Sequence, residues 1–551
     1  MKKRIIALLT VLVMILALAA CGTNTAQPAE SADSAAAEED GLWLELGGTE
    51  DIGRGGELTA HTTGAMMAQA WVFDTLVNWK DGKVVPALAE SWEISDDGKE
   101  YTFTMRPDVK FSNGDDWDAN VAEMNLKMAV KHKDENSWMA LLSHITSIKA
   151  TDDMTLVIKL DDVYYPALQE LASFTPVMML APSAFPDSGD PFTDEIKAPI
   201  GTGPWVLEEY KQDEYAKFSR NENYWGDMPK IDGFTLHVIP DGETMAANLE
   251  SGALDMVYDN YNSSSFNTES FLSFEKNKEF DTAISEEPTM VRQLVMYSDH
   301  ENLKDIKVRQ ALIYGLDRVT IGQTVYQGIE YPATGDDYGI FTKNMAYCDV
   351  EYDNVYDFDK DKAEKLLDEA GWKMNETTGI REKDGKPLVI TYVYDGSDPD
   401  RTTQAQLMQS MYKDIGVDLQ MDQTDASTLW DYRLSGEYDM IDYISWGFPY
   451  DPHSTMEALN PEDSQIFGLS RRGLSEDEQK ALYELFHSAI TEVDETKRAE
   501  IYSEVFNTWN DEAVVIPMSN ITNKAAYRKG ISGVTFNGAY DMPLNSITID
   551  E

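Results

Sequence analysis

A single apolar segment at the start of the chain, with no second one after it, constrains the fold most. Lys2, Lys3 and Arg4 precede a run that is apolar, apart from Thr10, from Ile5 to Ala20. After Ala20 no apolar stretch approaches the roughly 20 residues that span a bilayer. The rest of the chain, about 510 residues beyond the first 40, is therefore expected to form a water-soluble ectodomain. This length exceeds one hydrophobic core and favours two or three domains.

The first segment, residues 1–20, has the composition of a secretory signal peptide rather than of a stable anchor. It ends in LAACG (18–22), which resembles a bacterial lipobox, where small residues precede a cysteine whose thiol takes diacylglycerol. Cys21 is therefore expected to be the lipidated N-terminus of a mature protein anchored on the outer face of the membrane or in the periplasm. The alternative is an ordinary signal peptide with an incidental cysteine. Residues 21–40 are expected to form a flexible tether, because from residue 23 on they contain no large aliphatic or aromatic side chain.

The balance of charge is strongly acidic, with 45 basic and 98 acidic residues and a formal net charge of −53. Nucleic acid is excluded as a partner, because its phosphates would be repelled. Solubility of a surface protein explains the charge better than attraction of cations does. Of the two cysteines, Cys21 is assigned to lipid and Cys348 has no second cysteine to pair with, so no disulfide framework is possible.

Strand and helix patterns alternate along the chain. Residues 101–105 and 156–160 alternate apolar and polar side chains, which predicts two half-buried strands. Asp118 and Asp359 are placed to cap helices, and Gly371 is placed to end the second of them. The predicted apolar faces are Val121, Met124 and Met128 in the first helix and Ala363, Leu366, Leu367 and Ala370 in the second. Mixed elements over this length predict an α/β architecture in more than one domain.

Several motifs together resemble the signature of one family. PALAESW (86–92), DDGK (96–99), YTFTMR (101–106) and VKFSNG (109–114) are similar to the dipeptide-, oligopeptide- and nickel-binding proteins of bacterial ABC importers, the family 5 extracellular solute-binding proteins. Further matches are GTGPW (201–205), RNENYWG (220–226), VRQAL (308–312), the segment 359–372, WG (446–447) and DEAVVIP (511–517). The resemblance covers essentially the whole mature chain.

The resemblance implies an α/β, two-lobed fold like that of periplasmic binding proteins (type II, cluster C). Lobe I is expected to comprise residues 41–285 plus 519–551, including an inserted subdomain at about residues 80–200. Lobe II is expected to comprise residues 286–518. Two crossings of the chain act as the hinge, and a ligand that contacts both lobes favours the closed state.

Within the family, the nearest likeness is to the nickel-importer branch, through KAPIGTGPW (197–205), YYP (164–166) and WGFPYDPH (446–453). Dipeptide receptors usually carry an aspartate just after the equivalent Trp-x-Gly, where it pairs with the peptide ammonium group. Here Phe448, Pro449 and Tyr450 stand in that region, so the partner for the ammonium group is missing. The leading ligand is therefore nickel or a similar metal chelate, with a dipeptide or oligopeptide as the alternative.

The resemblance also implies which residues bind the ligand. Positions that line the pocket of the nickel branch match Met66, Trp138, Trp446 and Tyr450. Two polar positions do not match. The arginine that holds a chelator carboxylate falls at Thr175, and the histidine that ligates metal falls at about Ser464.

His61 stands where that branch has an aromatic residue close to the metal, and it is the one candidate metal ligand. Each candidate also has a structural interpretation. The tryptophans can pack in a core, Met66 can fill a gap, and His61 can be a solvated loop residue. His453 is interpreted as structural, a residue that holds its loop.

The expected partners are an ABC permease, its ATPase and one small ligand, bound by a monomer. No resident cofactor is expected, because the metal chelate would be cargo. Nothing resembles convergent carboxylates with a raised pKa, a Ser-His-Asp order or an HExxH helix, so the protein is not expected to be an enzyme. An enzyme on the same scaffold and a surface sensor with the same fold are the rival classes.

Overall fold

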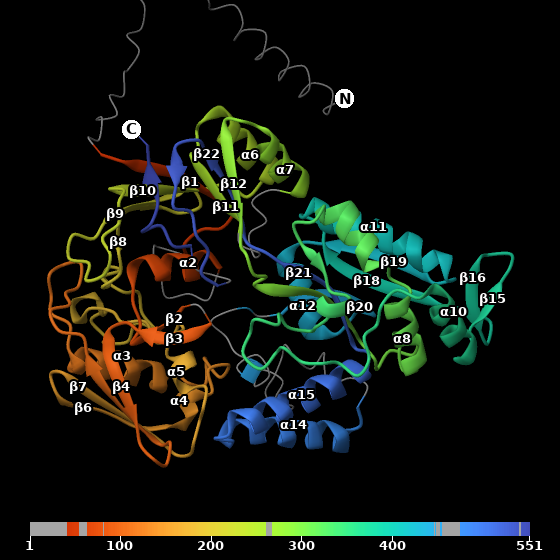
Figure 1. Cartoon of the computed structure of the whole chain (residues 1–551), viewed down its shortest axis with the longest axis horizontal. Coiled ribbons are helices and arrows are strands. Elements are labelled where there is room, and N and C mark those ends of the chain that lie inside the picture. The colour runs from red at the N-terminus through yellow and green to blue at the C-terminus, as the bar shows by residue number, and fades with distance from the viewer. Residues whose placement is uncertain are drawn as a thin grey trace, which may run out of the picture. The chain divides into compact units, whose positions relative to one another are not determined.

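The computed structural model describes residues 41–53, 63–80, 82–259, 267–445, 447, 452–453, 474–538 and 542–550. Nearly all of them belong to one compact unit, Leu42–Glu551. Two large sheets and a smaller four-stranded sheet form its framework, and helices pack against each of them (Figure 1).

The first large sheet has seven strands, with β1 (Trp43–Gly48) at its centre. β1 runs parallel to both of its neighbours, and the other pairs are antiparallel. The spatial order is β12 (Phe280–Ile284), β22 (Lys524–Arg528), β11 (Met256–Asp259), β1, β10 (Gly233–Val238), β9 (Tyr215–Arg220) and β8 (Trp205–Lys211). We refer to this sheet and the helices that pack on it as lobe I. Because β22 lies inside it, lobe I contains strands from both ends of the chain, as the family resemblance implies.

The second large sheet has six strands, and we refer to it and its helices as lobe II. The spatial order is β14 (Tyr331–Pro332), β21 (Val515–Ile521), β13 (Met290–Met296), β20 (Met440–Ile444), β18 (Val389–Asp395) and β19 (Asp418–Thr424). Every residue of β13, β20 and β21 is buried, so both faces of the middle of this sheet are covered. β18 runs parallel to β19 and β20. The helices α11 (Pro399–Asp414) and α12 (Ala426–Ser435) make the connections between these strands.

Two short segments join the sheets, one from β12 to β13 and one from β21 to β22. They lie side by side, because the Ser285 N–H donates to the Asn523 carbonyl and the Thr289 N–H donates to the Ile521 carbonyl, both at 2.8 Å. The two crossings that the resemblance implies are therefore present. The residue limits of the lobes remain a prediction, and β21 itself continues in the second sheet as far as Ile521.

The smaller sheet lies between β1 and β8 in the sequence. Its order is β4 (Ala89–Ile94), β5 (Glu100–Met105), β7 (Thr155–Leu160) and β6 (Ile145–Asp152), all antiparallel. Buried residues alternate with half-buried ones along β5, from Glu100 to Met105. The strands predicted at 101–105 and 156–160 are thus confirmed.

The two predicted helices are also present with their predicted caps, although Met124 and Met128 of the face predicted for the first helix are only half-buried and its buried face is formed mainly by Ala122, Leu126 and Ala129. The Asp118 carboxylate accepts a hydrogen bond from the Val121 N–H at 2.9 Å at the start of α3 (Ala119–Lys131). Asp359 accepts one from the Lys362 N–H at 2.9 Å at the start of α10 (Lys360–Glu369). Gly371 follows α10 with a φ of 89°, a left-handed conformation that glycine adopts without strain.

Further α-helices are α2 (Thr63–Val72), α4 (Leu141–His144), α5 (Ala167–Glu170), α6 (Gly242–Ser251), α7 (Thr268–Lys276), α8 (Ile306–Tyr314), α9 (Arg318–Ile321), α14 (Glu476–Thr491) and α15 (Glu495–Asp511). Short strands complete the fold: β2 (Val77–Lys80), β3 (Lys83–Pro86), β15 (Lys373–Asn375), β16 (Ile380–Lys383), β17 (Lys386–Pro387), β23 (Ile531–Ser532) and β24 (Thr548–Ile549). Figure 1 shows α6 and α7 beside β11 and β12 of lobe I, and α11 beside β18 and β19 of lobe II.

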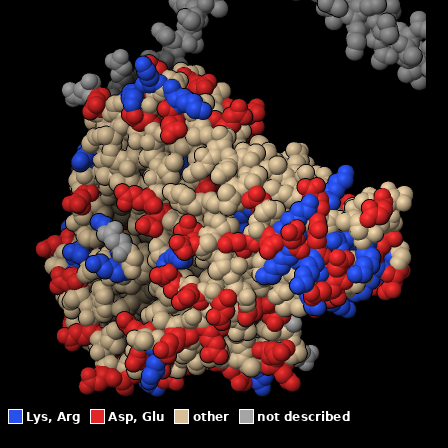
Figure 2. All heavy atoms as spheres, turned by 45° about the vertical axis from the view of Figure 1, so that its right-hand side comes forward, with Lys and Arg blue, Asp and Glu red and all other residues tan. Residues whose placement is uncertain are grey.

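Acidic side chains are spread over the visible face of the molecule, whereas many of the basic ones gather at its upper end and on its right-hand side (Figure 2). A dispersed acidic surface is what solubility requires, and it supports the solvated interpretation of the charge.

Candidate functional site

Met66 lies on α2, where its side chain is half-buried. Gln69 follows one turn later on the same side of the helix and is fully buried. The Thr175 hydroxyl, itself 4 % exposed, donates a hydrogen bond to the Gln69 Oε1 atom at 2.5 Å. Where the nickel branch has an arginine that holds a chelator carboxylate, this chain therefore has a neutral side chain that is bound to α2. It lies beside the helix that carries Met66, but it offers no charge to a ligand.

Trp138 lies in the segment between α3 and α4, and its indole is half-buried against the main hydrophobic core. The core-packing interpretation therefore accounts for part of this side chain, and the rest is accessible. The common membership of Trp138 and Met66 in one pocket stays a prediction.

The other predicted site residues, His61, Trp446, Tyr450 and Ser464, lie outside the described residues. The strand that leads to two of them is well defined. β20 is buried throughout, and Ser445 continues it by accepting a hydrogen bond from the Val291 N–H on its hydroxyl oxygen at 2.8 Å. The Ser445 N–H donates to the Val291 carbonyl at 2.9 Å. The chain is thus tied to β13 up to the residue before Trp446.

His453 is completely buried, and its ring stacks on Phe486 of α14 with centroids 4.8 Å apart. Tyr164 meets the same imidazole edge-on at a centroid distance of 5.7 Å. Burial, reinforced by the nearby His487 and His144, lowers the pKa of His453 well below its ordinary value. A neutral imidazole packed between aromatic rings agrees with the structural role predicted for it.

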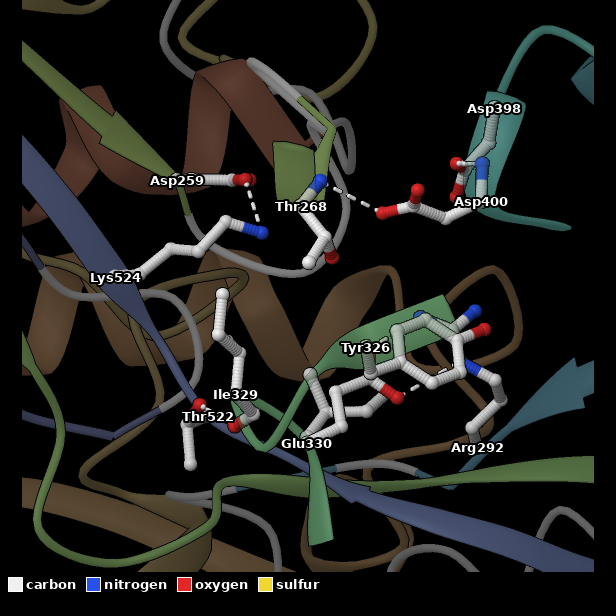
Figure 3. Close-up of a pocket in the computed structure, with 11 residues that line it drawn as sticks. Asp259, Thr268, Arg292, Tyr326, Ile329, Glu330, Asp398, Asp400, Thr522 and Lys524 are labelled. Carbon is white, nitrogen blue, oxygen red and sulfur yellow. Dashed lines mark hydrogen bonds and ion pairs between the residues drawn. The ribbon is translucent and has the colours of Figure 1, made fainter. Parts of the chain in front are cut away.

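A polar pocket, which we call the interlobe pocket, opens where lobe I meets lobe II (Figure 3). Its cavity volume, the space open to the centre of a water molecule, is about 30 Å³, and the pocket is partly open to solvent. Its charged lining residues are Asp259, Arg292, Glu330, Asp398, Asp400 and Lys524. No sequence pattern indicates this pocket, because its lining residues come from six separate stretches of the chain.

Two buried ion pairs form opposite walls of the interlobe pocket. In lobe II, Arg292 of β13 binds both carboxylate oxygens of Glu330, at 3.1 and 2.6 Å, and Glu330 holds the Arg292 pKa well above its ordinary value despite burial. In lobe I, the Lys524 ammonium lies 2.9 Å from the Asp259 carboxylate. Burial alone would lower the pKa of Lys524, but Asp259 outweighs it and raises that pKa. Each cation is therefore neutralised within its own lobe.

The third part of the interlobe pocket is the start of α11. The Asp398 carboxylate caps this helix by accepting from the Asp400 N–H at 2.9 Å and contacts Arg401 at 3.2 Å. The Asp400 carboxylate accepts instead from the Thr268 N–H of α7 at 2.8 Å (Figure 3). Burial and the neighbouring Asp398 carboxylate raise the pKa of Asp400. The Asp-Pro-Asp sequence at 398–400 signals a helix start, but nothing local indicates that Asp400 contacts another lobe.

Among the described residues, no group of three or more histidine, cysteine, aspartate or glutamate side chains is arranged to hold a metal ion. Within the same part of the chain, no helix is both long enough and apolar enough to cross a membrane.

Two sheets joined by two adjacent crossings, with a polar pocket between them, define a two-lobed substrate-binding protein. The chain belongs to the bacterial extracellular solute-binding proteins, family 5, whose model for the middle region matches residues 83–465. It is the substrate-binding protein of an ABC importer. Members of this family bind small ligands, work with ABC permease and ATPase components, and are not enzymes.

Three similar proteins illustrate the range of the family. The nickel-binding periplasmic protein of Escherichia coli is 34 % identical over 496 residues, which are 89 % of this chain and 92 % of that protein. NikA from Brucella suis, solved in complex with Fe(III)-EDTA, superposes with a TM-score of 0.85 at 32 % identity and covers 92 % of this chain and 100 % of its own. Heme-binding protein A of Haemophilus influenzae is 25 % identical, with 96 % of each chain covered.

Proposed function

We propose that this protein is a lipid-anchored receptor that captures a metal chelate of the nickel type between its lobes and delivers it to a membrane permease. The observation that carries the proposal is the likeness, over nine-tenths of the chain, to a nickel-binding periplasmic protein and to a relative solved with Fe(III)-EDTA. Both relatives exceed 30 % identity, so the likeness extends beyond the fold. The proposed ligand-binding residues are Met66, Trp138, Trp446, Tyr450 and His61.

The environment of Met66 supports a chelate rather than a bare ion. A selective site for a first-row metal needs several convergent nitrogen, oxygen or sulfur ligands. Met66 offers one soft thioether, and Thr175, bound to Gln69, offers no charge. In the proposed complex the metal enters wrapped in a small organic molecule, the indole faces of Trp138 and Trp446 pack on that molecule, and His61 supplies at most one direct bond.

The N-terminal sequence supports the anchoring part of the proposal. Cys21 stands at the end of an apolar signal, in a lipobox-like context. Acylation of its thiol would hold the ectodomain at the outer face of the membrane, with residues 21–40 as the tether. The receptor acts as a monomer in this proposal.

Isothermal titration calorimetry tests the proposed ligand class. Free Ni²⁺ should give no binding heat, whereas some Ni²⁺–chelator complexes, including complexes with histidine, should bind with one ligand per chain. If dipeptides bind tightly and every metal chelate is ignored, the protein is a peptide receptor instead.

A further inference from the structure

One hydrogen bond in the interlobe pocket links the two lobes directly. The Thr268 N–H, in the first residue of α7, donates to the Asp400 carboxylate at 2.8 Å. α7 packs on β12 and β22 of lobe I, and α11, which carries Asp400, packs on β18 and β19 of lobe II. Thr268 is 2 % exposed, so its N–H is withdrawn from water in this arrangement.

The contact pairs an N–H that has no acceptor inside its own helix with a carboxylate that accepts from it. The first N–H groups of a helix have no acceptor inside the helix, and together they carry a partial positive charge that favours an anion. The Asn267 side chain caps α7 by accepting from the Ser270 N–H at 2.8 Å, which leaves the Thr268 N–H to be satisfied from outside. Asp400 is that outside acceptor.

The two acids at the start of α11, Asp398 and Asp400, contact different lobes. Asp398 is engaged within lobe II, by the backbone at the start of the helix and by the Arg401 guanidinium at 3.2 Å. Arg401 also contacts Asp442 of β20 at 3.3 Å. The carboxylate of Asp400 is therefore the one in this pair that is turned toward lobe I, where the Lys524 ammonium adds a favourable charge.

We propose that Asp400 is a latch for the closed state. Its carboxylate binds the N-terminus of α7 when the lobes come together, so the strength of this contact sets the balance between open and closed forms and, through it, the affinity for ligand. The latch rests on the receptor function proposed above but not on the identity of the ligand. In this proposal the latch holds part of the population closed before cargo arrives.

The two ends of the hydrogen bond can be removed separately. Asp400→Ala removes the acceptor. Thr268→Pro removes the donor and leaves the helix intact, because proline is tolerated in the first position of a helix and the extended backbone of Asn267 suits a residue before proline. Thr268→Val keeps the N–H and serves as the matched control for the lost hydroxyl. Asp431→Ala, at an exposed position on α12 of the same lobe, is the control for a lost acidic charge.

The readout is the distance between the lobes, measured by double electron–electron resonance in the full chain without ligand. Nitroxide labels at Glu214→Cys and Glu376→Cys report on lobe I and lobe II, in a Cys21→Ser background where the remaining native thiol, Cys348, is buried. Asp400→Ala and Thr268→Pro should each reduce the short-distance population by a similar factor, roughly tenfold. The double variant should lose no more than either single variant. Asp431→Ala should resemble the wild type, and Thr268→Val, which keeps the N–H but loses a hydroxyl that also interacts with Asp400, should lose less than Thr268→Pro.

Three outcomes would overturn the latch. The first is a wild-type chain that never populates the short distance. The second is a distance distribution unchanged by Asp400→Ala. The third is a double variant whose loss is the product of the single losses, which would mean that the two residues act independently. If Asp400→Ala fails to fold, Thr268→Pro decides the question, because it removes the same hydrogen bond from the donor side. None of these distance measurements uses a ligand, so they would remain valid if the nickel-chelate proposal failed.

Discussion

The Asn523 N–H donates to the hydroxyl oxygen of Ser285 at 3.1 Å, while the Ser285 N–H donates to the Asn523 carbonyl at 2.8 Å. These two residues stand on the two crossings between the lobes, and both are buried. The crossings therefore form a paired unit rather than two independent linkers. A hinge of this kind can bend while its two segments stay together.

Replacing Ser285 by alanine should destabilise the protein. The substitution leaves the Asn523 N–H buried without its acceptor, which costs about 1–3 kcal/mol in the free energy of unfolding. Urea denaturation followed by circular dichroism measures the change. Ser397→Ala, at an exposed position, should change the stability by no more than about 0.5 kcal/mol. Equal stability of the Ser285 variant and the wild type would show that the hydroxyl contributes nothing at the crossing.

His453 should make the protein sensitive to mild acid. Its pKa is lowered in the folded state, from an ordinary value of 6.5, so the unfolded chain binds the proton first as the pH falls. The contribution of the neutral His453 imidazole to the free energy of unfolding is complete above about pH 6.5. It is lost progressively below that pH, by up to about 2 kcal/mol at pH 5. His453→Phe keeps an aromatic ring beside Phe486 and should flatten this part of the pH profile of the unfolding midpoint. An unchanged acid slope in that variant would assign the sensitivity to other groups.

Local patterns predicted the elements that local physics determines. Asp359 and Gly371 delimit α10 because capping and left-handed backbone are properties of a few neighbouring residues. Apolar and polar side chains alternate along β5 and β7 because one face of their sheet is more exposed than the other. Motifs spread over the chain then identified the family and with it the two-lobed fold.

The contacts between the lobes could not be predicted from local sequence patterns. Thr268 and Asp400 are 132 positions apart in the sequence, and no pattern around either one indicates the other. The same holds for Thr175, whose sequence position shows that an arginine is missing. Only the structure shows that its hydroxyl donates a hydrogen bond to Gln69, 106 positions away.

Replacing Cys21 by serine should release the protein from the membrane. The variant lacks the thiol that acylation requires, and two acyl chains suffice for stable anchoring because each buried methylene contributes roughly 0.8 kcal/mol. Fractionation of cells into membrane and soluble parts measures the release, and mass spectrometry of the wild-type N-terminus should show the added acyl mass. Cys348→Ser, which alters a buried thiol, should stay in the membrane fraction. Membrane attachment of the Cys21 variant, with no acyl mass on the wild type, would make the lipobox a coincidence.

Trp446→Ala should weaken the binding of Ni²⁺–histidine by at least about 1 kcal/mol, because the ligand loses stacking and apolar burial. Trp430→Ala is the matched control, since this indole is 42 % exposed on α12 and has no assigned role in binding. His61→Ala should weaken metal complexes more than the metal-free chelator, because only the metal gains from an imidazole nitrogen. Calorimetry of the wild type and of His61→Ala, each with both forms of the chelator, gives the four affinities that the comparison needs. Equal losses for the metal-loaded and metal-free chelator would remove His61 as a ligand while leaving the aromatic pocket in place. An unchanged affinity in Trp446→Ala would remove that residue from the pocket.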